Sequence, residues 1–168
     1  MPEFPPLIIT LSLDEASHAY FTKLRTKYFP AYCNYLDAHI TLFHRLHTTE
    51  RNIQETLQKL AERKIIKAEV ISIKNTGKGN SFTVASEELQ QLHKSMQQPF
   101  APYLIAKDRR KLHPHITIQN KVTAFKAEET TKALLQNFKP HFIQGIGLST
   151  WLYAKGPWIH LTDYLFKA

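Results

Sequence analysis

Two stretches of the sequence share a plan that could support acid–base chemistry. Residues 36–42 and 112–118 both read Leu, any residue, a small residue or Pro, and then His-Ile-Thr-aliphatic. The imidazole of histidine exchanges a proton near neutral pH, and a threonine hydroxyl two residues later can donate a hydrogen bond. Two such pairs facing each other would form an acid–base site, and its candidate residues are His39, Thr41, His115 and Thr117.

Both stretches have the alternation of polar and apolar residues that is typical of a half-buried strand, in which residues i and i+2 point to the same side. Each histidine should therefore share a face with its threonine. The same parity places Phe43 beside His39, where it could stack a base, and Lys121 beside His115, where it could hold a phosphate. A core phenylalanine and a solvated lysine are equally reasonable interpretations. His44 should face away from His39 and either pack against other side chains or lie on the surface.

The rest of the chain predicts elements that would position these strands. The apolar periodicity and the turn and cap residues indicate two similar halves, the first β-α-β-α and the second, after a hairpin, α-β-α-β. Thr131, Leu134, Leu135 and Phe138 should line the inner face of the fourth helix. Strands are predicted at 7–13, 38–46, 65–73, 81–85, 112–122, 143–154 and 158–166, and helices at 14–29, 49–61, 86–99 and 126–138.

These elements form a mixed α+β chain in which the motif strands occupy matching places. A pseudo-two-fold arrangement would bring the two motifs face to face across a central cleft. The basic run Arg109-Arg110-Lys111 could guide a polyanion toward such a cleft, although charge runs on loops are usually solvated. Tyr153 and Trp158 flank the last predicted turn and could line the mouth of the cleft or simply pack.

Composition limits the function classes. The 168 residues are enough for one domain, or for two lobes that share a site. The net charge of +8 favours a polyanionic partner, with nucleic acid or a phosphorylated metabolite ahead of a membrane surface. Cys33 is the only cysteine, which excludes an internal disulfide and a Cys-based zinc site. No leader and no stretch long enough to span a bilayer is found, so the cytoplasm is the expected compartment.

The motifs His39-Ile40-Thr41-Leu42 and His115-Ile116-Thr117-Ile118, with Pro114 before the second, resemble the paired signatures of the two-histidine (2H) phosphoesterase superfamily. The order and spacing of the elements are most similar to its bacterial branch of RNA 2′,3′-cyclic phosphodiesterases, also called 2′-5′ RNA ligases. The resemblance covers nearly the whole chain. It implies a single bilobal domain over residues 1–168, with two antiparallel sheets around a central cleft and helices outside. Nothing in the sequence demands more than a monomer, which is the expected state.

The chain departs from that branch at two places. His44-Arg45-Leu46 stands where members often carry Phe followed by Leu-Gly, and Asn120 stands where they often carry Arg. Both departures leave the catalytic quartet intact.

The resemblance implies hydrolysis of a 2′,3′-cyclic phosphate, or of a 2′-5′ phosphodiester, in RNA or a nucleotide without a metal or other cofactor. Such a reaction needs a base that takes a proton from water and an acid that protonates the leaving ribose oxygen. The resemblance implies that His39 is the acid and His115 the base, with the roles exchanged for ligation. Thr41 and Thr117 would donate to the phosphate oxygens, where charge gathers in the transition state.

Two other interpretations remain. A basic RNA-binding module could keep this fold and lack turnover, although two facing imidazoles serve no purpose in simple binding. The chain's histidines could also form a zinc site. Such sites usually need three protein ligands and a carboxylate or other hydrogen-bond partner that orients them. Strand parity points one of the candidates, His44, the wrong way for such a site.

Overall fold

The computed structural model describes residues 4–168 and contains seven strands and four α-helices in that range. Three short 3-10 helices, η1, η2 and η3, lie in the connections. The elements, in chain order, are β1 Leu7–Leu13, α1 Glu15–Tyr28, η1 Ala31–Cys33, β2 Ile40–Leu46, α2 Glu50–Leu60, β3 Ile66–Asn75, β4 Asn80–Ala85, α3 Glu87–Phe100, η2 Ala101–Tyr103, η3 Ala106–Arg109, β5 His115–Gln119, α4 Ala124–Leu135, β6 His141–Leu152 and β7 Ile159–Leu165.

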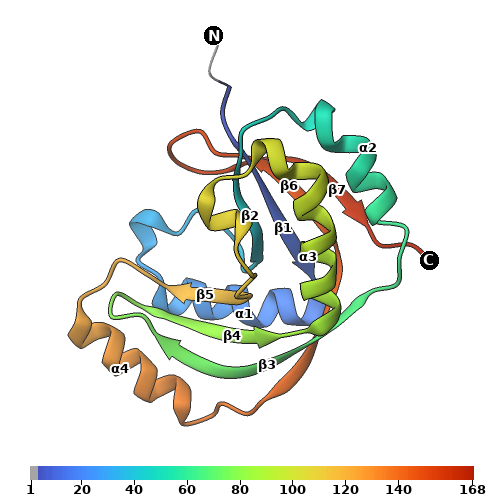
Figure 1. Cartoon of the computed structure of the whole chain (residues 1–168). Coiled ribbons are helices and arrows are strands. Elements are labelled where there is room, and N and C mark those ends of the chain that lie inside the picture. Colours follow the sequence, from blue (N-terminus) through green and yellow to red (C-terminus); the bar gives the residue numbers. More distant parts are fainter. Residues whose placement is uncertain (1–3) are drawn as a thin grey trace.

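All strand pairs are antiparallel, and the strands follow the order β2-β1-β6-β3-β4-β5, with β7 also paired to β6. The long strand β6 serves both lobes. Its first half, from His141 to Gly145, pairs with β3, and its second half, from Gly147 to Leu152, pairs with β7. Figure 1 shows the resulting curled sheet, with β1, β2, β6 and β7 in one lobe and β3, β4 and β5 in the other.

Helices α1 and α3 cross between the lobes and pack on the motif strands. Helix α1 follows β1 but packs on β5 in the opposite lobe. Helix α3 follows β4 but packs on β2, where the His93 ring stacks on Phe43 with a centroid distance of 4.6 Å. Helix α4 lies against β3 and β4 (Figure 1). Each motif strand is therefore supported by a helix that begins in the other half of the chain.

The predicted α+β class and bilobal arrangement are confirmed. The two expected antiparallel sheets are joined through β6 into one hydrogen-bonded sheet. Strand β2 begins at Ile40 and β5 ends at Gln119, so both motif strands are shorter than predicted. The predicted inward position of Leu135 is wrong, because its side chain is 58% exposed at the last turn of α4. No helix among residues 4–168 has the length and apolar character needed to cross a bilayer.

Candidate active site

The two motif histidines have the same local geometry. Nδ1 of His39 lies 2.8 Å from the carbonyl oxygen of Asp37, and Nδ1 of His115 lies 2.8 Å from the carbonyl oxygen of His113. A carbonyl only accepts hydrogen bonds, so Nδ1 carries the proton in each ring. This fixes the tautomer and leaves Nε2 of both rings free to exchange a proton.

The electrostatic environment of His39 favours its neutral form. Burial lowers the pKa of His39 from 6.5 to about 4, although the hydrogen bond to the Asp37 carbonyl acts in the opposite direction. The positive charges of Arg25, His115 and His44 lower this pKa further.

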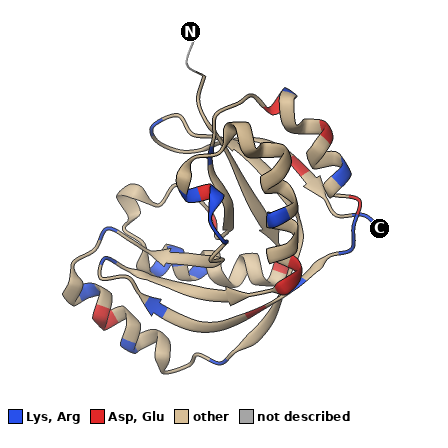
Figure 2. Ribbon diagram, viewed as in Figure 1, with Lys and Arg blue, Asp and Glu red and all other residues tan. Residues whose placement is uncertain are grey.

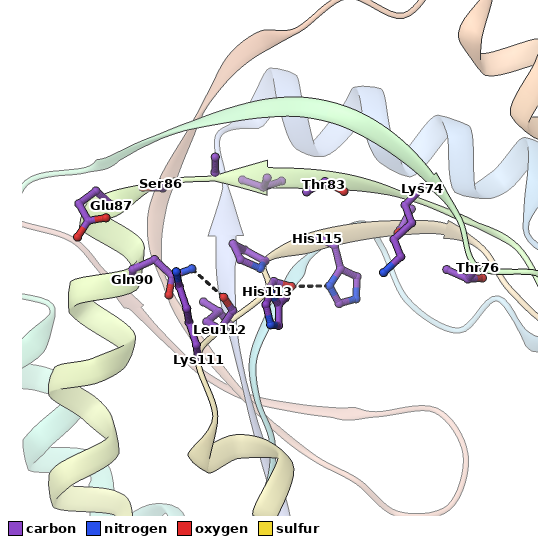
Figure 3. A pocket seen from close by; sticks show the side chains of 14 residues that line it. Lys74, Thr76, Thr83, Ser86, Glu87, Gln90, Lys111, Leu112, His113 and His115 are labelled. Carbon is purple, nitrogen blue, oxygen red and sulfur yellow. Dashed lines mark hydrogen bonds between the residues drawn. The ribbon is translucent and has the colours of Figure 1, made fainter.

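Three adjoining hollows lie on the cleft side of the motif strands. Thr41 and His115 line a cavity of about 170 Å³, which places residues of both motifs around one space. Thr117 and His115 line a second hollow of about 390 Å³. His115 also borders a groove of about 600 Å³ with Lys74 and Lys111, and Figure 3 shows the Lys74 ammonium pointing toward the His115 ring. Three of the four predicted residues, Thr41, Thr117 and His115, therefore line these hollows.

A bulge in β2 changes the side to which its later residues point. Thr41 is opposite Thr10 of β1, but Phe43 is opposite the very next β1 residue, Ile9. The extra residue sends both Leu42 and Phe43 into the core. The predicted role of Phe43 as a base-stacking residue is therefore wrong, because its side chain is 0% exposed and packs against helix α3.

The second motif strand has a bulge at the same relative place. Thr117 is opposite Ser81 of β4, and Gln119 is opposite the adjacent residue Asn80. Gln119 consequently turns inward and is buried. The strand ends there, and Lys121 has a left-handed φ of 60°. The strand parity that predicted Lys121 beside His115 does not reach that residue, so its contact with a phosphate stays a prediction without support from strand geometry.

The cations that do approach the second motif come from other segments. Lys74 and Lys111 line the groove beside His115, and Lys78 lines the hollow that contains Thr117. Lys111 belongs to the predicted basic run, which Figure 2 shows as mostly blue around η3 near the cleft. No sequence pattern favoured Lys74 or Lys78, because their approach depends on the register of β3 and β4.

Arg25 of α1 is a buried residue of the site that the sequence pattern missed. Its guanidinium donates to the carbonyl of Leu36 at 3.0 Å and to the carbonyl of Thr117 at 2.7 Å. These two carbonyls belong to the first and second motif stretches. Arg25 is 4% exposed, and its burial lowers its pKa to about 10, where it is still cationic at neutral pH. It therefore ties the two motifs together and places a positive charge behind His39.

His44 also lies at the site, contrary to the prediction from strand parity. Because of the bulge in β2, its ring lines the same cavity as Thr41 and His115. Its Nδ1 lies 2.9 Å from Oδ1 of Asp108, a carboxylate that is 3% exposed. The sequence offered no signal for this pair, since the two residues are 64 positions apart.

The segment that carries Asp108 is held by helix α3. Gln97 donates to the carbonyls of Asp108 at 3.1 Å and Arg110 at 2.9 Å, and Gln90 donates to the carbonyl of Leu112 at 2.7 Å (the last bond is drawn in Figure 3). These bonds fix the approach to the second motif.

Of the two aromatic residues predicted at the mouth, Trp158 lies beside His39, with ring centroids 5.1 Å apart. Trp158 also contacts Trp151, at 6.2 Å between centroids. Tyr153 instead packs under the guanidinium of Arg45. Across residues 4–168, no three His, Cys, Asp or Glu side chains converge as metal ligands would.

The chain is similar to one family model and to several solved structures. A family model described as the 2′-5′ RNA ligase superfamily matches residues 13–144. A search of curated proteins finds no match. Among solved structures, TT0787 of Thermus thermophilus is 17% identical with a TM-score of 0.65, covering 97% of this chain and 98% of that chain. E. coli LigT in complex with 3′-AMP is 15% identical with a TM-score of 0.60, covering 98% and 99%. A structure described as a phosphoesterase is 16% identical with a TM-score of 0.60, covering 98% and 99%.

Proposed function

Because this chain belongs to the 2′-5′ RNA ligase superfamily, we propose that it is a metal-independent phosphodiesterase. The substrate would be a 2′,3′-cyclic phosphate, or a 2′-5′ phosphodiester, in RNA or a nucleotide. The observation that carries this proposal is the shared geometry of the two motif imidazoles, each with Nδ1–H bound to a backbone carbonyl and Nε2 free. Two positioned imidazoles of this kind supply both the base and the acid that hydrolysis needs.

In the proposed reaction, one imidazole removes a proton from water as the water oxygen forms a bond to phosphorus. The bond from phosphorus to one ribose oxygen breaks, and the second imidazole protonates that oxygen. The products are a phosphate monoester and a ribose hydroxyl. The hydroxyls of Thr41 and Thr117 donate to the non-bridging oxygens, where fixed donors stabilise the charge of the transition state.

We assign the base to His39 and the acid to His115, which reverses the order that the family resemblance implies. An imidazole with a pKa near 4 is almost entirely neutral at pH 7, and a base must begin neutral. His115 borders the more open groove and hollow on the other side of the cleft. In the ligating direction the two roles would exchange.

The surroundings of the cleft support a nucleotide or RNA substrate. Lys74, Lys78 and Lys111 supply positive charge next to His115, where further phosphates could bind. The indole of Trp158 beside His39 offers a face on which a base could stack. E. coli LigT has been solved with 3′-AMP, NADP+ and ATP, and these nucleotides fit the same class of substrate.

The test is turnover of a 2′,3′-cyclic nucleotide, and of a short RNA that ends in a 2′,3′-cyclic phosphate, in excess EDTA. We expect hydrolysis by the wild type and a loss of about 10²–10⁴-fold in kcat for either His39→Ala or His115→Ala. His47→Ala, at an exposed histidine beyond β2, is the matched control and should leave kcat unchanged. The position of the product phosphate identifies the ribose oxygen that leaves.

Two results would contradict the proposal. Activity that appears only after zinc is added would overturn the metal-independent mechanism. Tight RNA binding without turnover, unchanged when both motif histidines are replaced, would favour the RNA-binding module instead.

A further inference from the structure

His44 and Asp108 are held together by hydrogen bonds at the cleft. Oδ1 of Asp108 binds Nδ1 of His44 at 2.9 Å. Oδ2 accepts the backbone N–H groups of His44 at 2.8 Å and Arg45 at 3.0 Å. Both carboxylate oxygens are therefore engaged, and all three donors come from the bulged part of β2. A buried carboxylate with this many donors is a fixed anion.

The charge state of Asp108 follows from these bonds. Burial alone would raise the pKa of Asp108, but the hydrogen bonds from the His44 ring and from the two backbone N–H groups outweigh it and lower the pKa below its usual value. An ionised carboxylate has no proton to donate, so Nδ1 of His44 carries the hydrogen of the bond between them. The other ring nitrogen, Nε2, makes no hydrogen bond to any side chain or backbone group of residues 4–168.

The Nε2 side of the His44 ring borders the cavity that Thr41 and His115 also line. Both His44 and Asp108 line the cavity, but the His44 side chain is 32% exposed while that of Asp108 is 2% exposed, so the imidazole is the more accessible of the two. That cavity, of about 170 Å³, is also lined by Thr41 and His115. It has room for a phosphate group among these three side chains.

His44 differs from His39 in the group that holds its Nδ1. For His39 this group is a neutral carbonyl, and a proton on Nε2 would create a buried charge without a partner. For His44 it is the Asp108 carboxylate, and a proton on Nε2 completes a neutral ion pair. A donor hydrogen on Nε2 of His44 would therefore be balanced by the Asp108 carboxylate, and one on Nε2 of His39 would not.

We propose that His44 is a third substrate-contacting imidazole, which donates from Nε2 to a non-bridging oxygen of the scissile phosphate while Asp108 acts as its positioning residue. This inference rests on the proposed phosphodiesterase function and adds a contact to the four motif residues. No bond changes at His44 during the reaction. Its contribution is a fixed donor aimed at the oxygen that gathers negative charge.

The first experiment measures kcat and KM of His44→Phe, which keeps a flat ring and removes the donor. Loss of one transition-state donor typically costs about 10²–10³-fold, so we expect kcat/KM to fall by that factor, mostly in kcat. The thermal midpoint should also fall, because Oδ1 of the buried Asp108 loses its donor, so kcat is measured well below that midpoint. His47→Phe replaces a neighbouring exposed histidine and should match the wild type. Wild-type kcat and KM in His44→Phe would overturn the inference while leaving the proposed function intact.

A double-mutant cycle separates positioning by Asp108 from general damage to its loop. Asp108→Asn should lower kcat/KM by less than His44→Phe does, because the imidazole remains but its anionic partner is lost. If Asp108 acts through His44, the double variant should lose no more than His44→Phe alone. Fully additive losses would show that Asp108 acts independently, and would overturn its assigned role.

A binding experiment tests the contact without turnover. Inorganic phosphate is titrated into the protein, and the imidazole resonances of His44, His39 and His115 are followed by NMR. We expect phosphate to shift the His44 ring signals together with those of the motif histidines. Shifts at His39 and His115 without any at His44 would refute the inference. Shifts at all three in a protein that hydrolyses neither cyclic substrate would refute the proposed function and support the phosphate contact.

Discussion

The two catalytic histidines of the proposed mechanism make identical local bonds but lie in different surroundings. His39 is half-buried behind Trp158, whereas His115 is exposed beside Lys74 and Lys111. Burial and the charge of Arg25 both disfavour the protonated form of His39. The proposed choice of the base therefore rests on what surrounds each imidazole, because both motifs share the His-Ile-Thr plan.

The pH dependence of kcat/KM tests this assignment. If His39 is the base, activity should not be lost through its protonation until the pH falls close to 4. If His39 were the acid, its active protonated fraction would instead rise about tenfold for each unit between pH 7 and pH 4. A rate that climbs in this way would refute our assignment.

The same pKa can be checked through stability. The folded state holds His39 neutral, while the unfolded chain takes up a proton below about pH 6.5. The free energy of unfolding should therefore fall as the pH drops from about 6.5 to about 4. Urea unfolding of the wild type and of His39→Gln at about pH 6.5 and about pH 4 tests this, because the variant should lack the part of the decrease that comes from His39.

At the scale of the elements, the duplicated bulge explains which predictions succeeded. The alternation of side chains along a strand correctly predicted that Thr41 faces the cleft, because Thr41 precedes the bulge in β2. The alternation failed at Phe43 and His44, which follow the bulge, and it does not extend to Lys121, which lies beyond the end of β5. A bulge depends on how two strands pair, and the side-chain pattern of one strand does not encode it.

Helix α1 contributes to both motifs through one side chain, and this can be tested. Arg25→Met keeps the length of the side chain but leaves the carbonyls of Leu36 and Thr117 without their donor. We expect a loss of about 2–3 kcal/mol in the free energy of unfolding. The pKa of His39 should also rise, because one of the charges that lower it is gone.

Arg25→Lys separates the two effects. Lysine keeps the charge but cannot reproduce the planar set of donors. It should therefore restore most of the low His39 pKa and little of the stability, as measured by urea unfolding and by NMR titration of the ring. A free energy of unfolding for Arg25→Met equal to that of the wild type would show that the hydrogen bonds from Arg25 to Leu36 and Thr117 do not stabilise the fold.

At the scale of the whole molecule, β6 determines how the lobes meet. Its partner changes from β3 to β7 across Gly145 and Gly147, and the register with β1 shifts there as well. A Cβ on Gly147 would lie 2.7 Å from the carbonyl oxygen of Tyr164 in β7. A backbone atom cannot move aside as a side chain can, so only glycine fits this crossing.

Gly147→Ala should therefore lower the free energy of unfolding by about 1–3 kcal/mol, measured in urea. Gly156→Ala is the matched control, since a Cβ there would have no neighbour within 4 Å. Equal stability of the two variants would mean that the crossing adapts easily.

The order of the elements and the duplicated plan could be predicted from sequence, because periodicity and capping residues are local. The burial of Asp108 and of Arg25 could not, since each results from contacts between distant segments. Asp108 meets β2 only because α3 holds its loop, and Arg25 reaches β5 only because α1 crosses to the other lobe. Both look like ordinary surface charges in the sequence.

The pairing of β1 with β6 also has a consequence for synthesis on the ribosome. Leu7 of β1 pairs with Leu152 of β6, so β1 cannot complete its pairing until β6 has been synthesised. Until β6 emerges, β1 lacks one neighbour and β3 lacks another, and each presents an open edge that attracts other strands. Folding with such distant contacts is intrinsically slow. The nascent chain should therefore depend on chaperones longer than its modest length suggests.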